Sequence, residues 1–479
     1  MSKTIIIIGA GLAGLSAALQ AAENGCNVKL VSSLPSERAQ SVMAEGGINA
    51  ALNTKDENDS PEEHFTDTIK AACGLADPNA VWGMTQAAPE LVHWLLKLGV
   101  KFNMSGHDDV DLRNFGGQKK KRTAFAQSDT GKQIMTAMID AVRRKEASGM
   151  VERFSHHSFL TLRLCGNICC GCVIRDEYSQ ETVELPGDAV IVATGGMHGL
   201  FGNTTGSLSN TGEVTAELFR LGVPLANGEM IQYHPTTVKC GGKRMLISEA
   251  ARGEGGRLFA MKDGKQWYFM EEKYPELGNL MPRDITAREI WKVSHESEVF
   301  LDMTEISEEI ISNKLSGLAD DCMTYLHKDI RKEPVSVLPG IHYFMGGILV
   351  DEQHRTPIQN LYAAGECCAQ YHGANRLGGN SLLGALYGGR VAAKSACEQA
   401  DVVDLSCATQ IDFPPASQIS EIKQLNKVMQ ETMGVVRNEN TLLNGIQTVQ
   451  ALTGNLPLLG MAVPVSYTHL RAHETSQDL

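Results

Sequence analysis

The chain has 479 residues, of which 43% are hydrophobic and 21% charged, and it carries a formal net charge of −13. Nucleic-acid binding needs a basic face, so this acidic balance argues against nucleic acid as the main partner, and an anionic substrate would need a local cationic pocket. No apolar run approaches the ~20 residues that cross a bilayer, so we expect no direct membrane span. Twelve cysteines without a recognisable secretory leader are typical of reduced thiols in a cytoplasmic protein.

The first predicted strand, Thr4 to Ile8, holds four consecutive isoleucines and ends at a glycine, as strands buried on both faces often do. Gly9, Gly11 and Gly14 follow in Gly-x-Gly-x-x-Gly spacing and open a helix rich in alanine and leucine. In this pattern the first glycine permits a tight turn, the second lets a pyrophosphate approach the backbone, and the third lets helix and strand pack closely. We therefore predict dinucleotide binding at the helix N-terminus; a plain tight turn is the alternative.

A second strand is predicted from Asn27 to Ser32. Adenosine-binding folds often place an acid at the end of this strand to hold the ribose, but Ser32 stands there, so NAD specificity is not supported. Two later loops contain Gly46-Gly47 and Gly116-Gly117, which either allow a ligand close to the backbone or serve as flexible connections. The basic run at 119–122 is typical of a solvated surface and could instead attract an anionic substrate.

Two further strands are predicted to end in glycine turns, at 189–196 and at 361–366. Such strands belong to a parallel sheet whose carboxyl ends face a ligand crevice. The segment between them, from about 227 to 341, is richer in Tyr, Trp and charge and indicates an inserted second domain. The cysteines at 165–172 lack the paired Cys-x-x-Cys units of zinc or iron–sulfur sites, so we expect thiols that pack between strands and no metal.

From Gln232-Tyr233-His234-Pro235 onward the motifs are no longer generic. The chain resembles the flavoprotein subunit of the succinate dehydrogenase/fumarate reductase family, which also includes L-aspartate oxidases and soluble fumarate reductases. The resemblance covers roughly residues 5–453. Its other motifs, in family order, lie at 44–47, 115–118, 193–196, 248–256, 282–284, 342–347 and 372–382.

This resemblance implies an α/β fold with a Rossmann-like FAD-binding domain, an inserted α+β capping domain and a C-terminal helical domain. The expected bounds are 1–226 and 342–416 for the FAD-binding domain, 227–341 for the capping domain and 417–464 for the helical domain. Residues 465–479 break the preceding helical pattern and look like a translated sequencing-library adapter. We therefore expect a non-native tail there and a truncated helical domain.

The resemblance also assigns residues to the cofactor. The positions that match FAD contacts are Gly9, Gly11, Gly14, Ser32, Gly46, Gly47, Gly195, Glu366, Ser381 and Leu382. Among them, Glu366 matches the acid that holds ribitol or ribose hydroxyls.

Fumarate and succinate are dianions, so a closed pocket needs cationic groups at both carboxylates. In the family pattern His342 and Arg376 match the groups at one carboxylate. His234 and Ser248 match the groups at the other carboxylate. Arg283 matches the family's proton donor, and Glu249 and Arg252 match its proton relay to solvent. Alone, each histidine or arginine would be more often structural; together in family context they indicate a site.

Three positions depart from the family pattern. Gln40 stands two residues after Arg38, where enzymes with covalently attached flavin carry the linking His, so FAD should be non-covalent. Since that bond raises the flavin potential in the family, its absence disfavours succinate oxidation. Ser248 replaces a common Thr and keeps the hydroxyl, and Glu213 replaces a common Asp without an assigned consequence.

The leading hypothesis is reduction of fumarate to succinate by hydride transfer from reduced FAD. L-aspartate oxidase or a reductase of a related enoate is the nearest alternative, although Phe115 stands where the aspartate-oxidase branch has a Glu for the substrate ammonium. A third reading is an FAD-binding electron carrier or assembly component without its own substrate chemistry. Expected partners are a small dicarboxylate and an iron–sulfur or other electron-donor subunit. The expected location is cytoplasmic, with any membrane association made through such a partner.

Overall fold

A five-stranded sheet, in which every neighbouring pair of strands is parallel, forms the centre of the nucleotide-binding part of the chain. The computed structural model describes residues 2–106, 109–401 and 419–452. The strand order is β20 (Leu361–Ala363), β10 (Ala189–Val192), β1 (Thr4–Ile8), β2 (Asn27–Ser32) and β6 (Val151–Ser155). This confirms the predicted strands and their parallel arrangement.

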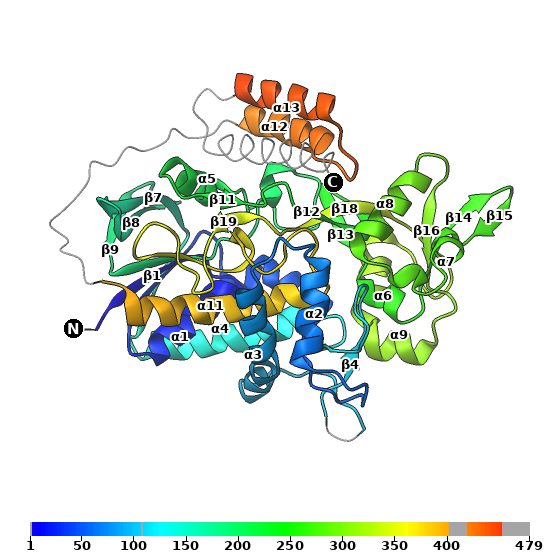
Figure 1. Ribbon diagram of the computed structural model, residues 1–479, viewed down its shortest axis with the longest axis horizontal. Coiled ribbons are helices and arrows are strands. Elements are labelled where there is room, and N and C mark those ends of the chain that lie inside the picture. The colour runs from blue at the N-terminus through cyan, green and yellow to red at the C-terminus, as the bar shows by residue number, and fades with distance from the viewer. Residues whose placement is uncertain (1, 107–108, 402–418, 453–479) are drawn as a thin grey trace.

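Alternate isoleucines of β1 belong to two different cores, as the two-residue period of a strand requires. Ile5 and Ile7 lie in the cluster that contains helices α1 (Leu12–Glu23) and α11 (Asn380–Gln399), which pack side by side (Figure 1). Ile6 and Ile8 face the antiparallel strands of the opposite layer. That layer consists of β7 (His157–Cys165), β8 (Ile168–Asp176) and β9 (Thr182–Pro186). The run of isoleucines is therefore covered on both faces.

The layer of α1 and α11 is completed by α2 (Pro61–Ala71), α3 (Pro78–Lys97) and α4 (Thr130–Ala147). Short strands and one helix join these layers: β3 (Ile48–Asn49), β4 (Leu112–Arg113), β5 (Thr123–Ala124), α5 (Glu213–Arg220), β11 (Leu225–Ala226), β19 (Gly347–Leu349) and β21 (Cys368–Ala369). Strand β3 pairs with β5, and this pairing places the segment after Gly46-Gly47 beside the start of α11.

A separate lobe of mixed helices and strands lies to one side of the central sheet (green in Figure 1). The lobe includes a three-stranded sheet of β13 (Lys243–Leu246), β12 (Ile231–Cys240) and β18 (Leu338–Phe344). The rest comprises α6 (Glu249–Gly253), β14 (Arg257–Lys262), β15 (Lys265–Trp267), α7 (Phe269–Lys273), α8 (Arg283–Val293), β16 (Val299–Asp302), α9 (Glu308–Lys314), α10 (Ser316–Asp321) and β17 (Val335–Ser336). This lobe is the α+β capping domain that the resemblance implied; its exact bounds stay a prediction.

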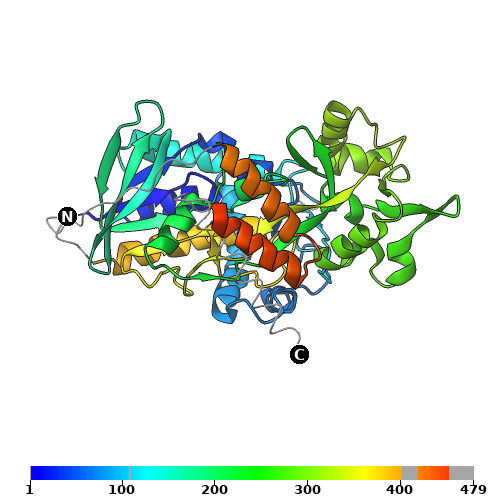
Figure 2. The same cartoon turned by 90° about the horizontal axis from the view of Figure 1, so that it is seen from above.

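Two C-terminal helices, α12 (Ile419–Thr432) and α13 (Glu439–Leu452), lie next to each other across the central part of the molecule (Figure 2). Met429 and Leu442 join a core with Phe201 and Phe344, so the pair is anchored by apolar burial. The predicted helical domain is thus present in the described residues. The predicted boundary at 416–417, the end of the helical domain at 464 and the tail at 465–479 lie outside them.

The cysteines of the β7–β9 layer follow the sequence expectation in part. Cys169 and Cys172 are buried free thiols, and burial raises the pKa of each. Cys165 is instead disulfide-bonded, which the spacing of the cysteines did not predict.

Candidate active site

A cavity of about 570 Å³ runs between the carboxyl end of the parallel sheet and the capping domain. The turn after β1 forms one wall of this cavity, and close backbone contacts there require glycines. At Gly9, whose φ is +110°, a Cβ would lie 2.2 Å from the Ala193 carbonyl oxygen, and at Gly14 a Cβ would lie 1.8 Å from the Gly9 oxygen. These distances allow no side chain. Gly11 lines the cavity at the N-terminus of α1, where the helix leaves backbone N–H groups without intrahelical partners.

The structure brings nine of the ten predicted FAD-contact residues to the wall of this cavity. They are Gly9, Gly11, Ser32, Gly46, Gly47, Gly195, Glu366, Ser381 and Leu382. Gly14 does not line the cavity and lies beneath it, where it lets α1 pack on the turn. Glu366 accepts a hydrogen bond from the Phe344 backbone N–H at 3.1 Å and lies 3.4 Å from His198 Nε2.

Several polar atoms at this cavity are buried and have no hydrogen-bond partner in the described residues. They are Ser32 Oγ, Glu45 Oε2 and Arg376 Nε. A buried polar atom without a partner costs roughly 1–3 kcal/mol, so a polar ligand that reached these atoms would be stabilised. Together with the glycine turn and the helix N-terminus, these atoms fit a dinucleotide such as FAD.

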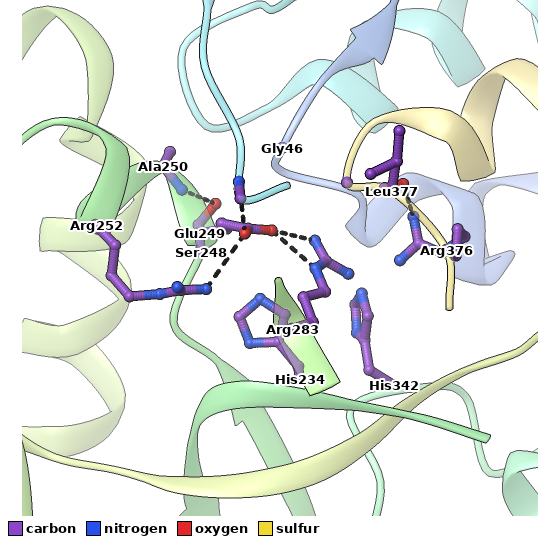
Figure 3. A network of polar contacts seen from close by, with 12 residues as sticks. Gly46, His234, Ser248, Glu249, Ala250, Arg252, Arg283, His342, Arg376 and Leu377 are labelled. Atoms are coloured by element: carbon purple, nitrogen blue, oxygen red, sulfur yellow. Dashed lines mark hydrogen bonds and ion pairs between the residues drawn. The ribbon is translucent and has the colours of Figure 1, made fainter. Parts of the chain in front are cut away.

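The two histidines at the cavity lie on two neighbouring strands of the capping lobe. His234 lies on β12, and His342 lies on β18, where the register between the strands shifts from Gln232↔Tyr343 to Tyr233↔Ile341. His342 is the extra residue at this bulge, and bulges re-aim a side chain in this way. The two imidazole rings lie edge to face, with their centroids 5.1 Å apart and an interplanar angle of 64° (Figure 3).

Arg283 and Glu249 form the ion pair at the centre of Figure 3. Both Arg283 Nε (2.8 Å) and Nη2 (2.7 Å) donate to Glu249 Oε2. The other carboxylate oxygen, Oε1, accepts from the Gly116 N–H at 3.0 Å and lies 3.4 Å from Arg252 Nη2. Glu249 and Arg252 are three residues apart on α6, so one helix face carries both. The three side chains therefore form a continuous chain of charged contacts.

The N-caps of two short helices set the positions of these groups. Ser248 caps α6, and its hydroxyl accepts from the Ala250 N–H at 3.4 Å, so Glu249 begins the helix with its side chain turned to the cavity. Pro282 precedes Arg283, the first residue of α8. Ser248 itself lines the cavity, and its oxygen also serves as this cap.

Arg376 and Arg283 are linked through Gln232. The Gln232 Oε1 atom accepts from Arg283 Nη1 at 3.0 Å and from Arg376 Nη2 at 3.0 Å. The Arg376 guanidinium also stacks 4.3 Å from the centre of the Tyr343 ring. One buried amide oxygen thus holds two cations side by side at the cavity wall.

Burial and neighbouring arginines set the charges of these groups. Burial, followed by Arg283, lowers the pKa of both His234 and His342 well below the usual value, so both rings are neutral at pH 7. They can offer a neutral N–H to a carboxylate, whereas the sequence pattern had suggested cationic groups. Burial lowers the pKa of Arg376 to about 9. Burial raises the pKa of Glu249, but Arg283 and Arg252 outweigh it and hold the pKa below its usual value.

Sequence reasoning did not assign four groups that the structure places here. Gln232 could have been found from the motif, because residues two apart on a strand share a face and His234 was already assigned. Thr205 Oγ lies 2.8 Å from His342 Nδ1 and orients that ring. Thr205 carries no local signal, and Gly116 lies in a glycine pair that was noted without a partner for its N–H. Glu45 lies within a quoted motif but had no role; burial, followed by the charge of Asp321, raises its pKa to about 8.

No group of three or more potential metal ligands occurs in the part of the chain that the structure describes. In those same residues, no helix is both long and apolar enough to span a membrane.

Residues 4–382 match the family model of the FAD binding domain. The chain is 40% identical over 466 residues to the succinate dehydrogenase flavoprotein subunit of Bacillus subtilis, covering 95% of this chain and 79% of the relative. It is 32% identical over 474 residues to the L-aspartate oxidase of Streptomyces coelicolor, covering 94% and 80%. Among solved structures it is similar to E. coli quinol fumarate reductase, with a TM-score of 0.86, 27% identity and coverage of 98% and 87%.

The fold and these similarities define an FAD-dependent oxidoreductase. The chain belongs to the FAD-binding flavoprotein family of succinate dehydrogenases and fumarate reductases, with L-aspartate oxidases among its relatives.

Proposed function

We propose that this protein reduces fumarate to succinate, with Arg283 as the proton donor. The observation that carries the proposal is the contact between Arg283 and Glu249, in which two guanidinium N–H groups meet one carboxylate oxygen beside two neutral histidines. A purely structural ion pair would not need two neutral imidazoles beside it, nor a second cavity-lining arginine, Arg376, that has no ion-pair partner in the described part of the chain.

Substrate capture falls to four cavity-lining residues. Arg376 has an unpartnered Nε at the cavity and would bind one carboxylate together with His342. His234 and Ser248 would bind the other carboxylate. Charge-assisted hydrogen bonds to a carboxylate are about twice as strong as neutral ones, so Arg376 should contribute most to affinity.

Reduced FAD, when bound, supplies a hydride to one alkene carbon. The other carbon then gains carbanion character, which the adjacent carboxylate delocalises, and it must receive a proton. Guanidinium ordinarily keeps its proton. The contact with Glu249 would resolve this difficulty, because the carboxylate can take a proton from the Arg252 side and pass one to Arg283 while Arg283 gives its own to carbon. Arg252 lies on the other side of Glu249 and would extend the relay.

The remaining proposals concern the cofactor and its partners. FAD is bound non-covalently, because Gln40 lines the cavity where a linking His would stand and an amide cannot form that bond. Several relatives are named as flavoprotein subunits. An iron–sulfur or other electron-donor subunit is therefore proposed as the partner, with a cytoplasmic location for this chain.

L-aspartate oxidation is less well supported. Phe115, which is buried and lines the cavity, offers no carboxylate to a substrate ammonium at the position that serves this role in that branch. The proposal is tested by mixing the reduced holoprotein anaerobically with fumarate, other enoates or buffer, and by testing reduction of the oxidised form by L-aspartate. Rapid oxidation of the reduced flavin by fumarate supports fumarate reduction. Reduction of the oxidised flavin by L-aspartate, without any oxidation of the reduced flavin by fumarate, would show instead that the protein is an L-aspartate oxidase.

A further inference from the structure

The turn that carries Arg376 is held from behind by a buried polar cluster, which we call the Asn49 cluster. Its members come from five separate segments: Asn49 on β3, His64 and Thr68 on α2, Gln118, Thr123 on β5 and Asn380 on α11. None is more than 5% exposed. None of the six lines the cavity, so they lie behind its wall.

Asn49 is the centre of this cluster. Its Nδ2 donates to the Gly378 carbonyl oxygen at 2.8 Å and to Asn380 Oδ1 at 2.7 Å. Its Oδ1 accepts from Thr123 Oγ1 at 2.6 Å, so the orientation of the amide is determined by partners at both ends. The backbone N–H of Asn49 also donates to the Gly379 oxygen at 3.2 Å. Asn49 thus contacts three consecutive residues, the last two of the turn and the first of α11.

The turn has little freedom to move away from these contacts. Gly379 has a φ of +86°, and a Cβ there would lie 2.1 Å from Asn49 Oδ1, so the amide packs directly on the backbone. The Gly378 oxygen accepts a second hydrogen bond from Gln118 Nε2 at 2.9 Å. On the other side, the Arg376 carbonyl accepts from Gln232 Nε2 at 2.7 Å. The two sides together hold the backbone from which the Arg376 side chain extends.

Asn49 also connects two parts of the cavity wall. It follows Gly46 and Gly47, which line the cavity, with only Ile48 between, and the turn it holds continues into Ser381 and Leu382, which also line it. A displacement of Asn49 would therefore change the distance between the Gly46-Gly47 loop and Arg376.

We propose that Asn49 is a positioning residue for the dicarboxylate, which acts through the turn of residues 376–379 to keep Arg376 in place. This inference rests on the proposed function. The chemistry required of Asn49 is specific: its nitrogen must donate to two oxygens. In Asn380, by contrast, the atom that meets Asn49 is the oxygen, which accepts from Asn49 and lies 2.9 Å from His64 Nε2, while its nitrogen donates to Thr68 Oγ1 on α2 at 3.1 Å.

This difference provides a matched pair of isosteric variants, Asn49→Asp and Asn380→Asp. The first places a carboxylate oxygen against two acceptors beside Arg376, whereas the second keeps the acceptor for Asn49 and gives up the hydrogen bond to Thr68 on α2. The dissociation constant of succinate is measured from the absorbance change of the bound flavin, beside the melting temperature and the separate kcat and KM for fumarate. We expect Asn49→Asp to weaken succinate binding by about tenfold or more, the equivalent of losing one to two buried hydrogen bonds. Asn380→Asp should lower the melting temperature, but its dissociation constant for succinate should stay within about twofold of wild type, because the hydrogen bond it loses is made to α2 and not to the turn that carries Arg376.

Thr123→Val provides a milder second test, because it removes only the hydroxyl that orients the Asn49 amide. This variant should raise the dissociation constant of succinate and the KM for fumarate several-fold, with a smaller change in kcat. Equal succinate affinity in wild type and Thr123→Val, or equal weakening in Asn49→Asp and Asn380→Asp, would overturn the inference. If Asn49→Asp does not fold, Thr123→Val alone decides. A wild-type protein that neither binds succinate nor reduces fumarate would instead refute the proposed function.

Discussion

Arg283 and Glu249 are joined through a single carboxylate oxygen, which accepts from Nε at 2.8 Å and from Nη2 at 2.7 Å, while the second oxygen of Glu249 is held by the Gly116 N–H. The side chain of Glu249 is 1% exposed and that of Arg283 is 7% exposed. Water therefore has little access to the pair, and a proton that leaves Arg283 must be replaced through Glu249.

Glu249→Gln should lower kcat for fumarate reduction by about 10²-fold or more, because an amide cannot return a proton to Arg283. It should also lower the melting temperature, since the buried guanidinium groups of Arg283 and Arg252 lose their shared anion. Stopped-flow kinetics and thermal unfolding of the same preparation measure both effects. Near-normal kcat in a well-folded variant would exclude Glu249 from the relay.

FAD should be released intact when the protein is precipitated with acid or heated, because Gln40 stands at the linking position. The released flavin is measured by its absorbance in the supernatant. Flavin that remains on the polypeptide through denaturing electrophoresis would show a covalent bond and refute the assignment. Gln40→His alone need not create the bond, since attachment also depends on the surrounding geometry.

The protein should reduce fumarate faster than it oxidises succinate under matched driving force. The reason is the lower flavin potential expected without a covalent link. Electrode or dye-coupled assays in both directions measure the ratio. A rate of succinate oxidation equal to that of fumarate reduction would contradict this prediction.

Glu45→Gln should change how stability depends on pH. Burial, and then the charges of Asp321 and Asp129, raise the pKa of Glu45 to about 8 in the folded protein, although Arg113 lowers it. Between about pH 4.5 and 8 the unfolded chain loses this proton while the folded protein keeps it, so the stability of the wild-type apoprotein should fall as pH rises. Glu45→Gln should lose this part of the slope. Thermal unfolding from pH 5 to 8 measures the difference, and identical slopes would show that Glu45 is ionised in the folded protein.

Local sequence signals were sufficient for the first strand, the glycine turn and the parallel sheet, because strand burial and turn conformation depend on near neighbours. Ile5 to Ile8 and the close approaches at Gly9 and Gly14 are examples. The resemblance added the capping domain and the pairing of distant residues such as Glu249 and Arg283, which are 34 positions apart.

Other features depend on tertiary geometry that no local pattern contains. His342 faces His234 because β18 bulges at that residue, and a bulge is a property of the pairing of two strands. The lowered pKa of both histidines follows from burial near Arg283, which residue type alone does not indicate. Thr205 and Asn49 act through contacts with residues more than 100 positions away.

The central claim is that Arg283 donates the proton, and single-turnover reoxidation of the reduced flavin by fumarate tests it most directly. Lysine keeps the positive charge but is shorter and lacks the planar fork, so Arg283→Lys should lower the rate by about 10²–10⁴-fold while FAD stays bound and the dissociation constant of fumarate changes little. Arg376→Lys, the matched control, should weaken fumarate binding as well, because its proposed role is carboxylate capture. If Arg283→Lys reoxidises at a near-normal rate, Arg283 is not the acid, and His234 or His342 becomes the next candidate.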